Sequence, residues 1–184
     1  MESEKLISSK SYGLATDILW QICPNKIHAQ FEYTAPPLVH SLFYVHERIR
    51  GDIFTALYLT EKLQIWKPEE VIIKNKTDAH IWLADVRIYL EIETGSQGRQ
   101  KIEGKLREYQ QYWRDTQEKF EVIFAVDGKD EVEWMLKLFD EMRVPYLVTT
   151  QKALAFMPLE APLQSRLRQW TLAEIIQKST PVLE

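Results

Sequence analysis

Residues Asp78 to Glu93 read DAHIWLADVRIYLEIE and carry the clearest structural pattern in the chain. Two segments rich in β-branched and aromatic residues flank Ala84-Asp85, which is typical of two β-strands joined by a short turn. A two-residue turn at this point places Asp78 opposite Glu91. Directly opposed residues on antiparallel strands share a face, with Cβ atoms ~5 Å apart. Glu93 then points the same way as Glu91, because side chains alternate between the faces of a sheet.

Three carboxylates are therefore expected to converge on one patch of sheet. Like charges placed so closely repel one another, and a buried carboxylate either takes up a proton or finds a cation. Mg²⁺ is one such cation, since it prefers oxygen ligands and often takes only one or two carboxylates plus water. The pattern is compatible with a metal site at Asp78 and Glu91. The alternative left open is that Asp78 caps a strand while Glu91 and Glu93 lie on a solvated face.

The segment that follows the hairpin is expected to be a helix over Gln100–Trp113. Its apolar stripe comprises Ile102, Leu106, Tyr109 and Trp113. Lys105 lies beside this stripe, at the border of the face that is expected to cover the sheet. A lysine at that place is able to extend over the carboxylate patch and act as its charge partner. Lys101, one turn earlier, is expected on the solvated face.

The rest of the chain alternates helical and strand patterns. Apolar spacing predicts a helical region from Leu38 to Leu63, with an interruption at Gly51-Asp52. Further elements are expected as a short helix over Ala15–Cys23, strands over His28–Tyr33, Val71–Ile73, Phe120–Val126, Val144–Val148 and Ala153–Met157, a helix over Asp130–Met142 and a helix from Thr171. An antiparallel hairpin followed by βαβ-like crossovers predicts an α/β fold with a mixed sheet and flanking helices.

The composition fits one globular domain. The 184 residues are 45% hydrophobic and 27% charged, with a net charge of −4. The single cysteine, Cys23, excludes an intramolecular disulfide and a Cys-rich zinc site. No apolar run is long enough to span a bilayer, and Met1–Lys10 lacks a secretory pattern. We therefore expect a cytoplasmic protein with no membrane partner.

Basic residues concentrate around the hairpin of this mildly acidic chain. A phosphate backbone is expected to lie there, because local cations attract it even when the net charge is negative. The residues expected to contact DNA are Lys74, Lys76, Arg99, Lys101 and Tyr109. The four histidines are scattered and lack metal-ligand spacing except, loosely, for His80 beside Asp78. Thr94–Gly98 lacks the spacing of a nucleotide-binding loop.

Three motifs in order resemble the PD-(D/E)XK nuclease-like superfamily. They are Thr77-Asp78-Ala79, Leu90-Glu91-Ile92-Glu93-Thr94-Gly95 and Lys105-Leu106-Arg107-Glu108-Tyr109. Within that superfamily, the stretch from Leu38 to Thr150 is most similar to the replication-relaxation family of plasmid and conjugative-element proteins. The resemblance implies a restriction-endonuclease-like core.

The resemblance also implies roles for individual residues. Asp78 and Glu91 would be the metal-binding pair for Mg²⁺ or Mn²⁺, with the main-chain carbonyl of Ile92 as a further ligand. Glu70 would be the additional acidic ligand that some members supply. Glu93 would position water or a second ion.

Two positions depart from the family's pattern. Thr77 stands where proline is usual, and Glu93 stands where the motif's lysine belongs. The missing lysine matters, because it orients water or stabilises developing charge in a nuclease. Lys105 is the expected substitute, since the lysine of this superfamily sometimes moves to the neighbouring helix. A pseudo-nuclease that keeps only the fold is the alternative.

The expected organisation is an N-terminal extension over residues 1–37, a PD-(D/E)XK-like core over 38–150 and a C-terminal strand and helix extension over 151–184. The expected function is DNA processing in plasmid or mobile-element replication or transfer, by metal-dependent phosphodiester hydrolysis. The alternative is an inactive accessory that binds DNA, a relaxase or a replication protein. A homodimer is left open. The N-terminal extension is too short for the winged helix that is common in the family.

Overall fold

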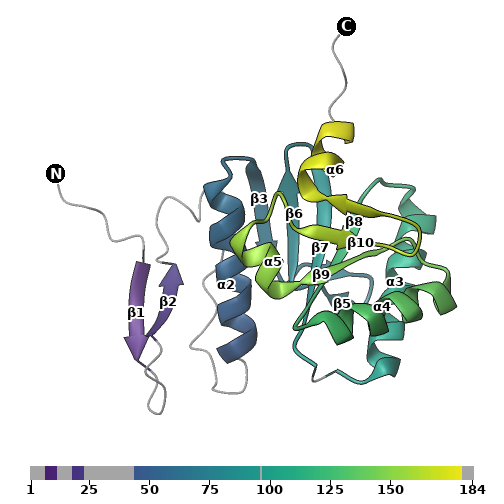
Figure 1. Cartoon of the computed structure of the whole chain (residues 1–184), viewed down its shortest axis with the longest axis horizontal. Coiled ribbons are helices and arrows are strands. Elements are labelled where there is room, and N and C mark those ends of the chain that lie inside the picture. Colours follow the sequence, from purple (N-terminus) through teal and green to yellow (C-terminus); the bar gives the residue numbers. More distant parts are fainter. Residues whose placement is uncertain (1–6, 12–17, 23–43, 96, 180–184) are drawn as a thin grey trace, which may run out of the picture.

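The computed structural model describes residues 7–11, 18–22, 44–95 and 97–179 (Figure 1). Its main feature is a seven-stranded sheet in the order β11-β10-β9-β8-β7-β6-β3. The strands are β3 (Leu63–Pro68), β6 (Ala79–Leu83), β7 (Val86–Glu93), β8 (Glu121–Val126), β9 (Leu147–Thr150), β10 (Pro162–Gln164) and β11 (Gln169–Thr171). β7, β8 and β9 run parallel, and the remaining neighbours pair antiparallel. The predicted mixed α/β class is confirmed.

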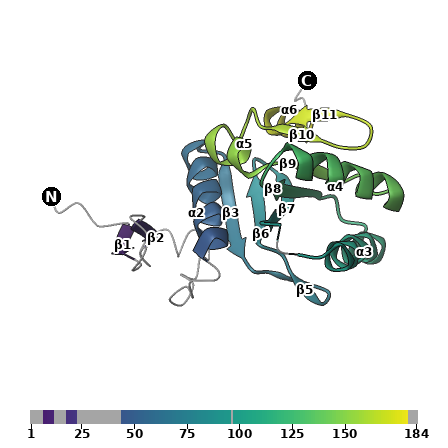
Figure 2. The same ribbon diagram turned by 60° about the horizontal axis from the view of Figure 1, so that its bottom comes forward.

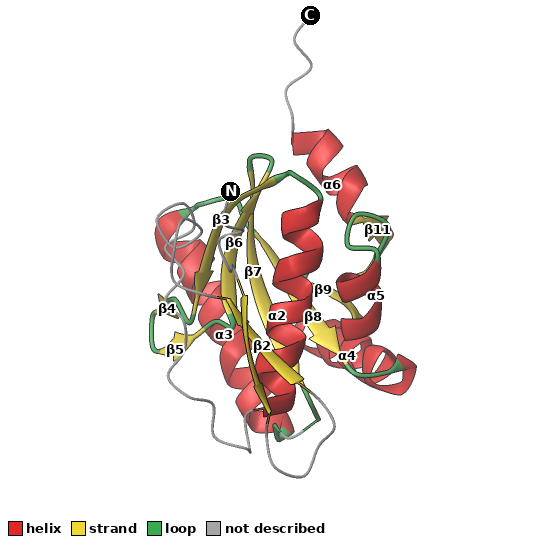
Figure 3. Ribbon diagram, turned by 90° about the vertical axis from the view of Figure 1, so that its left-hand side faces the viewer, coloured by secondary structure: helices red, strands yellow, loops and turns green. Residues whose placement is uncertain are grey.

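Helices cover both faces of this sheet, as Figures 2 and 3 show. They are α2 (Tyr44–Leu59), α3 (Arg99–Thr116), α4 (Lys129–Met142), α5 (Gln151–Phe156) and α6 (Leu172–Ser179). α3 and α4 pack on one face with Tyr89 and Phe124, and α2, α5 and α6 pack on the other with Leu90 and Ile92. The alternation of side chains along β7 therefore feeds two separate cores.

The hairpin of β6 and β7 has the predicted register. Leu83 pairs with Val86 and Ala79 pairs with Leu90. The turn residues Ala84 and Asp85 both have positive φ angles, 44° and 68°, as a type I′ turn requires. A residue other than glycine pays ~1–2 kcal/mol in this conformation. The register is thus imposed by the apolar faces of the strands, against the local preference of the turn.

The first strand of the sheet differs from the prediction. The described part of the predicted 38–63 helix is α2, which passes through Gly51 without interruption and ends at Leu59. A tight turn follows, with Glu61 in the left-handed region at φ 58°. Leu63–Pro68 then forms β3, which was missed because its alternation is short. The predicted strand over Val71–Ile73 forms only β4 (Val71–Ile72), which pairs with β5 (Asn75–Lys76) in a small separate hairpin.

The C-terminal region joins the core, and one of its elements was predicted wrongly. Ala153–Met157 lies largely in α5 and not in a strand. Its N-cap explains the difference, because the Thr150 hydroxyl accepts a hydrogen bond from the Ala153 N–H at 3.2 Å. The predicted helix from Thr171 is confirmed as α6. Leu163 of β10 and Leu172 of α6 belong to the same hydrophobic cluster as Leu90.

The N-terminal segment contains a second, two-stranded antiparallel sheet. Its strands are β1 (Ile7–Ser11) and β2 (Ile18–Ile22). The helix predicted over Ala15–Cys23 is therefore wrong for residues 18–22, and the strand predicted over His28–Tyr33 lies outside the described residues. Among the described helices, none combines the length and the apolar character needed to cross a membrane.

Candidate functional site

Two carboxylates of β7 are buried against α3. Glu91 is 1% exposed and Glu93 is 4% exposed, and both belong to the face that α3 covers. The ammonium group of Lys105, which is 6% exposed, lies between them. Its Nζ is 2.5 Å from Glu91 Oε2 and 3.2 Å from Glu93 Oε1. The predicted charge partnership between the helix lysine and the strand carboxylates is present in this structure.

The environment shifts the pKa of each member of this trio. Burial raises the pKa of Glu91 to about 7, although the positive charge of Lys105 opposes the shift. Burial also raises the pKa of Glu93. The two carboxylates hold the pKa of Lys105 well above its usual value, despite its own burial. Lys105 is therefore a permanent cation in this site.

Tyr109 completes the surroundings of Glu91. Its hydroxyl donates a hydrogen bond to Glu91 Oε1 at 2.5 Å, so each oxygen of that carboxylate has a donor. Glu93 has fewer hydrogen-bond donors than Glu91, because its Oε2 is buried with no hydrogen-bond partner among the described residues. Tyr109 was predicted to contact DNA, but its ring is buried here and its hydroxyl supports Glu91 instead.

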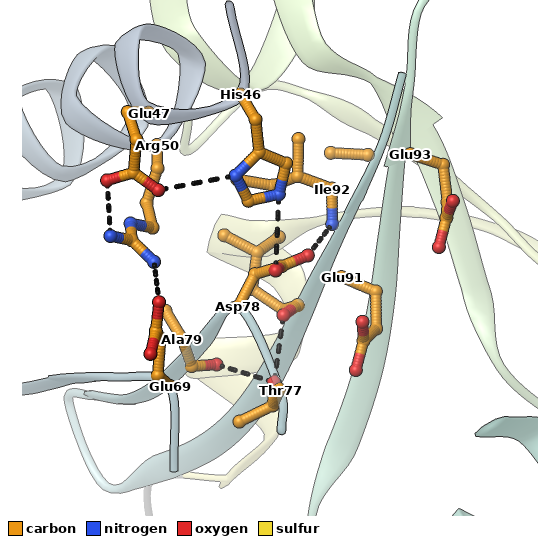
Figure 4. A network of polar contacts seen from close by, with 12 residues as sticks. His46, Glu47, Arg50, Glu69, Thr77, Asp78, Ala79, Glu91, Ile92 and Glu93 are labelled. Carbon is orange, nitrogen blue, oxygen red and sulfur yellow. Dashed lines mark hydrogen bonds and ion pairs between the residues drawn. The ribbon is translucent and has the colours of Figure 1, made fainter. Parts of the chain in front are cut away.

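Asp78 lies just before β6 and is turned toward α2, as Figure 4 shows. Its Oδ2 accepts a hydrogen bond from the Ile92 N–H at 2.6 Å, and its Oδ1 lies 3.2 Å from His46 Nε2. The paired register ends at Ala79 opposite Leu90, and the Asp78 N–H donates to the Leu90 carbonyl, so the predicted pairing of Asp78 with Glu91 is not formed. The single patch of three carboxylates is therefore divided. Asp78 faces His46, whereas Glu91 and Glu93 face Lys105.

Charge still connects the two halves of the cluster. The negative charge of Asp78 contributes to the raised pKa of Glu91 and to the raised pKa of Lys105. Burial alone would raise the pKa of Asp78, but the hydrogen bond and charge of His46 lower it below its usual value. The pKa of His46 is raised to about 9, because Asp78 and Glu47 outweigh the effect of burial. Asp78 and His46 are thus an ion pair at neutral pH.

The contribution of α2 was missed by the sequence analysis. Glu47 lies 3.5 Å from His46 and pairs with Arg50, which in turn lies 3.7 Å from Glu69 (Figure 4). A signal for this network exists in the sequence. The core stripe of α2, which includes Ile53 and Leu57, continues one and two turns earlier at Arg50 and His46. Charged residues at such positions must be paired when they are buried.

Thr77 and Glu70 flank the site. Thr77, which stands where the family's proline is usual, donates its hydroxyl to the carbonyls of Leu90 and Ala79 at 2.9 and 3.2 Å. It therefore fixes the strand that carries Glu91. Glu70 was predicted as an additional metal ligand, but its carboxylate is paired with the His80 ring and not with the Asp78–Glu91 cluster.

The basic residues predicted to contact DNA are dispersed. Lys74 is exposed at the turn of the β4–β5 hairpin, and Lys76 pairs with Glu69 at 2.9 Å. Arg99 is exposed but is bound to Glu103 and Glu141. Lys101 is exposed, and its charge reaches Glu93. Lys74 and Lys101 therefore keep their charges available at the surface.

The donors of the cluster suit a hard divalent cation. Asp78 and Glu91 supply carboxylate oxygens, and the unpartnered Oε2 of Glu93 is a further oxygen in the same region. Among the described residues, no group of three or more His, Cys, Asp or Glu side chains is arranged to hold a metal ion. Each oxygen of Asp78 and of Glu91 already has a partner within the protein, so a cation that binds both carboxylates would have to displace some of these contacts.

Comparison with family models, with curated proteins and with solved structures found no match of any of the three kinds.

Proposed function

We propose that this chain is a PD-(D/E)XK-like DNA-processing protein that acts in plasmid or mobile-element replication or transfer. Its activity would be divalent-metal-dependent hydrolysis of phosphodiester bonds at the cluster of Asp78, Glu91 and Lys105. The observation that carries the proposal is the burial of the Lys105 ammonium between Glu91 and Glu93. This lysine comes from the helix, in the place where the resemblance requires a substitute.

The fold supports the proposal without depending on Lys105. Asp78 lies just before β6, and Glu91 lies in β7 of the same antiparallel hairpin. The hairpin is followed by the helix α3 and by β8, which pairs parallel to β7. This is the order in which the resemblance places its motifs. A buried cluster of ionisable groups with strongly perturbed pKa values is also more frequent at functional sites than elsewhere.

The chain's own residues have distinct roles in this proposal. Asp78 and Glu91 would hold Mg²⁺ or Mn²⁺, which supplies Lewis-acid activation of the phosphate or water when it is bound. Lys105 would stabilise negative charge that develops on the phosphate, because its pKa keeps it charged. His46 holds Asp78 and Tyr109 holds Glu91, so both are positioning residues. Glu93 anchors the ammonium group.

A second candidate function is a catalytically silent accessory that binds DNA, a relaxase or a replication protein. The observation that favours it is the closure of the Lys105 cluster. Glu91 and Glu93 are less than 5% exposed, and Lys105 already neutralises part of their charge. A fold that has lost catalysis would keep such a cluster because losing one partner of a buried ion pair is strongly destabilising.

Nicking of supercoiled plasmid separates the two candidates. Purified wild-type protein is incubated with plasmid and Mn²⁺ or Mg²⁺, and the loss of supercoiled DNA is followed on gels. The activity proposal expects nicking that is abolished by EDTA and lost in Asp78→Asn. Asp115→Asn, an exposed carboxylate near the end of α3, is the matched control and should nick as the wild type does.

Folding of every variant is checked by circular dichroism, so that loss of activity is not loss of structure. If folded wild-type protein fails to nick over a wide range of either metal, the activity proposal is refuted and the accessory function is favoured. Nicking that persists in Asp78→Asn would show that the activity comes from a different site or from a contaminant.

A further inference from the structure

A second concave surface lies away from the carboxylate cluster, at the amino-terminal ends of the parallel strands β8 and β9. It is a groove of about 700 Å³ that extends from the second half of α3 to the β10–β11 hairpin and α6. Figure 2 shows this hairpin at the edge of the sheet. The groove is lined by aromatic and basic side chains that include Trp113, Arg114, Arg143, Tyr146, Arg168 and Lys178.

The groove is strongly basic on a chain whose net charge is −4. Arg114, Arg143, Arg168 and Lys178 line it, and none of the four forms an ion pair with another described side chain. The acidic residue among the described lining is Glu121, whose pKa is raised by burial. Unpaired cations gathered around a groove create a local positive potential that attracts anionic ligands.

The aromatic side chains give the groove flat apolar surfaces. Trp113 is 52% exposed, although large aromatic rings usually lie buried in a core. Trp170 carries two cations over its ring, because Lys178 Nζ and Arg168 Cζ lie 3.2 and 5.5 Å from its centroid. These contacts hold the cations at the wall of the groove. The lining of the groove therefore combines an exposed indole, that of Trp113, with positive charges.

We propose that this groove binds single-stranded DNA. An unpaired strand offers both a phosphate for each cation and a base face for an exposed indole. A duplex hides its base faces in the stack, so it would leave Trp113 without a partner. An acidic peptide would satisfy the cations but has no general need for a flat ring. The choice of DNA over RNA rests on the proposed function, whereas the inference that the groove binds a single strand does not.

The position of the groove relates it to the carboxylate cluster. Lys105, Tyr109 and Trp113 are spaced four residues apart on α3, so the indole lies ~12 Å along the helix axis from the lysine. Tyr146 lies between the two regions, since it lines the groove and its ring contacts Tyr109 edge-on. A strand bound along Trp113 would be held near the cluster without occupying it.

Binding is measured by fluorescence anisotropy with a labelled oligothymidylate of about twelve nucleotides, in EDTA, so that no metal-dependent cleavage takes place. Contacts of three cations with phosphates predict a slope of about −2 for log affinity against log salt. Raising the salt from about 50 to about 200 mM should therefore weaken binding roughly 20-fold. Quenching of tryptophan fluorescence should accompany binding.

Two variants test the groove directly. Trp113→Ala should weaken binding by about fivefold or more, the effect of losing one stacked base. Arg143→Gly should reduce the salt slope, and it leaves the backbone unstrained because Arg143 has φ 54°, which glycine adopts freely. The matched controls on α4 are Trp134→Ala and Lys137→Gln, whose side chains are exposed outside the groove. Both should leave the affinity and its salt dependence unchanged.

The outcomes are distinct from those of the nicking experiment. Asp78→Asn should bind the oligothymidylate as the wild type does. A negative result in the nicking experiment therefore does not refute binding of a single strand in the groove. Unchanged binding by Trp113→Ala overturns it. Equal or tighter binding of a duplex, of an oligouridylate or of an oligoglutamate peptide also overturns it, because each identifies a different occupant.

Discussion

Replacing Lys105 by methionine removes an ammonium group buried between two carboxylates, while much of the side chain's length is kept. From sequence, Lys105 was expected to be partly exposed, and its removal to leave the fold nearly intact. The expected exposure is wrong, because the side chain is 6% exposed and contacts both Glu91 and Glu93. The variant should instead be clearly destabilised.

The magnitude follows from the cost of leaving buried charge unpaired. Removing one partner of a buried ion pair costs roughly 3–5 kcal/mol. The hydroxyl of Tyr109 remains on Glu91, which favours the lower end of this range at pH 8. With a total stability of roughly 5–15 kcal/mol for a domain, the variant should still fold.

The loss in free energy of unfolding caused by Lys105→Met should increase with pH. Burial raises the pKa of both Glu91 and Glu93 in the folded protein, and removing the ammonium raises them further. A carboxyl group whose pKa is higher in the folded state loses stability as pH rises through that folded pKa. The deficit of Lys105→Met should therefore be smallest near pH 5 and should grow toward pH 8.

Urea unfolding followed by tryptophan fluorescence at these two pH values measures the effect. Lys101→Met, one turn earlier and exposed, is the matched control and should change stability by less than about 0.5 kcal/mol. The double variant Glu91→Gln with Lys105→Met should recover part of the loss. A deficit for Lys105→Met below about 1 kcal/mol at pH 8 would refute the buried ion-pair cluster.

Two further predictions concern the elements that carry this cluster. Changing Ala84-Asp85 to Asn-Gly should stabilise the protein by about 1 kcal/mol or more, since both positions have positive φ. Thermal unfolding checks this, and no increase in Tm would show that the turn is not strained. Tyr109→Phe should cost about 1–3 kcal/mol at pH 8, because a buried oxygen of Glu91 loses its donor. The control is Tyr112→Phe, whose hydroxyl is only partly buried; an equal effect of both would contradict the role of Tyr109.

The hairpin was predictable because its signal is redundant. Alternating apolar faces on both strands allow one register only, since a slip of one residue would turn every core side chain to the opposite face. The same argument holds for three of the four residues in the predicted stripe of α3, since Ile102, Leu106 and Tyr109 are buried as expected, whereas Trp113 at the end of the stripe is 52% exposed. The register held even though Ala84-Asp85 is a poor sequence for its turn.

Elements set by local capping were harder to predict. Residues 153–157 have an apolar pattern compatible with a strand, and the decision for a helix depends on Thr150 acting as N-cap. β3 was not predicted because the turn between α2 and β3 contains no glycine or proline to mark the end of the helix. In both cases one or two backbone angles, rather than the hydrophobic pattern, decide the structure.

The orientation of Asp78 could not be obtained from register alone. Asp78 lies at the end of the ladder, where its side chain is free to leave the face that the alternation assigns. Its direction is set by two partners distant in sequence, the Ile92 N–H and the His46 ring. The spacing of His46 gives no metal-ligand signal, and its role in the structure is that of an ion-pair partner of Asp78.

The acidic residue at position 93 is best understood together with Lys105, the basic residue that faces it. The resemblance expects a cation at this strand position, and the chain has an anion there with a lysine facing it from α3. A buried Glu93 without Lys105 would carry an uncompensated charge, and Lys105 without Glu93 would have Glu91 as its one contacting carboxylate. Glu93 and Lys105 therefore stabilise each other, and one positive charge lies beside Glu91. Any cation that binds Glu91 competes with Lys105 for the same carboxylate, and Glu93 remains to hold the displaced ammonium within the cluster.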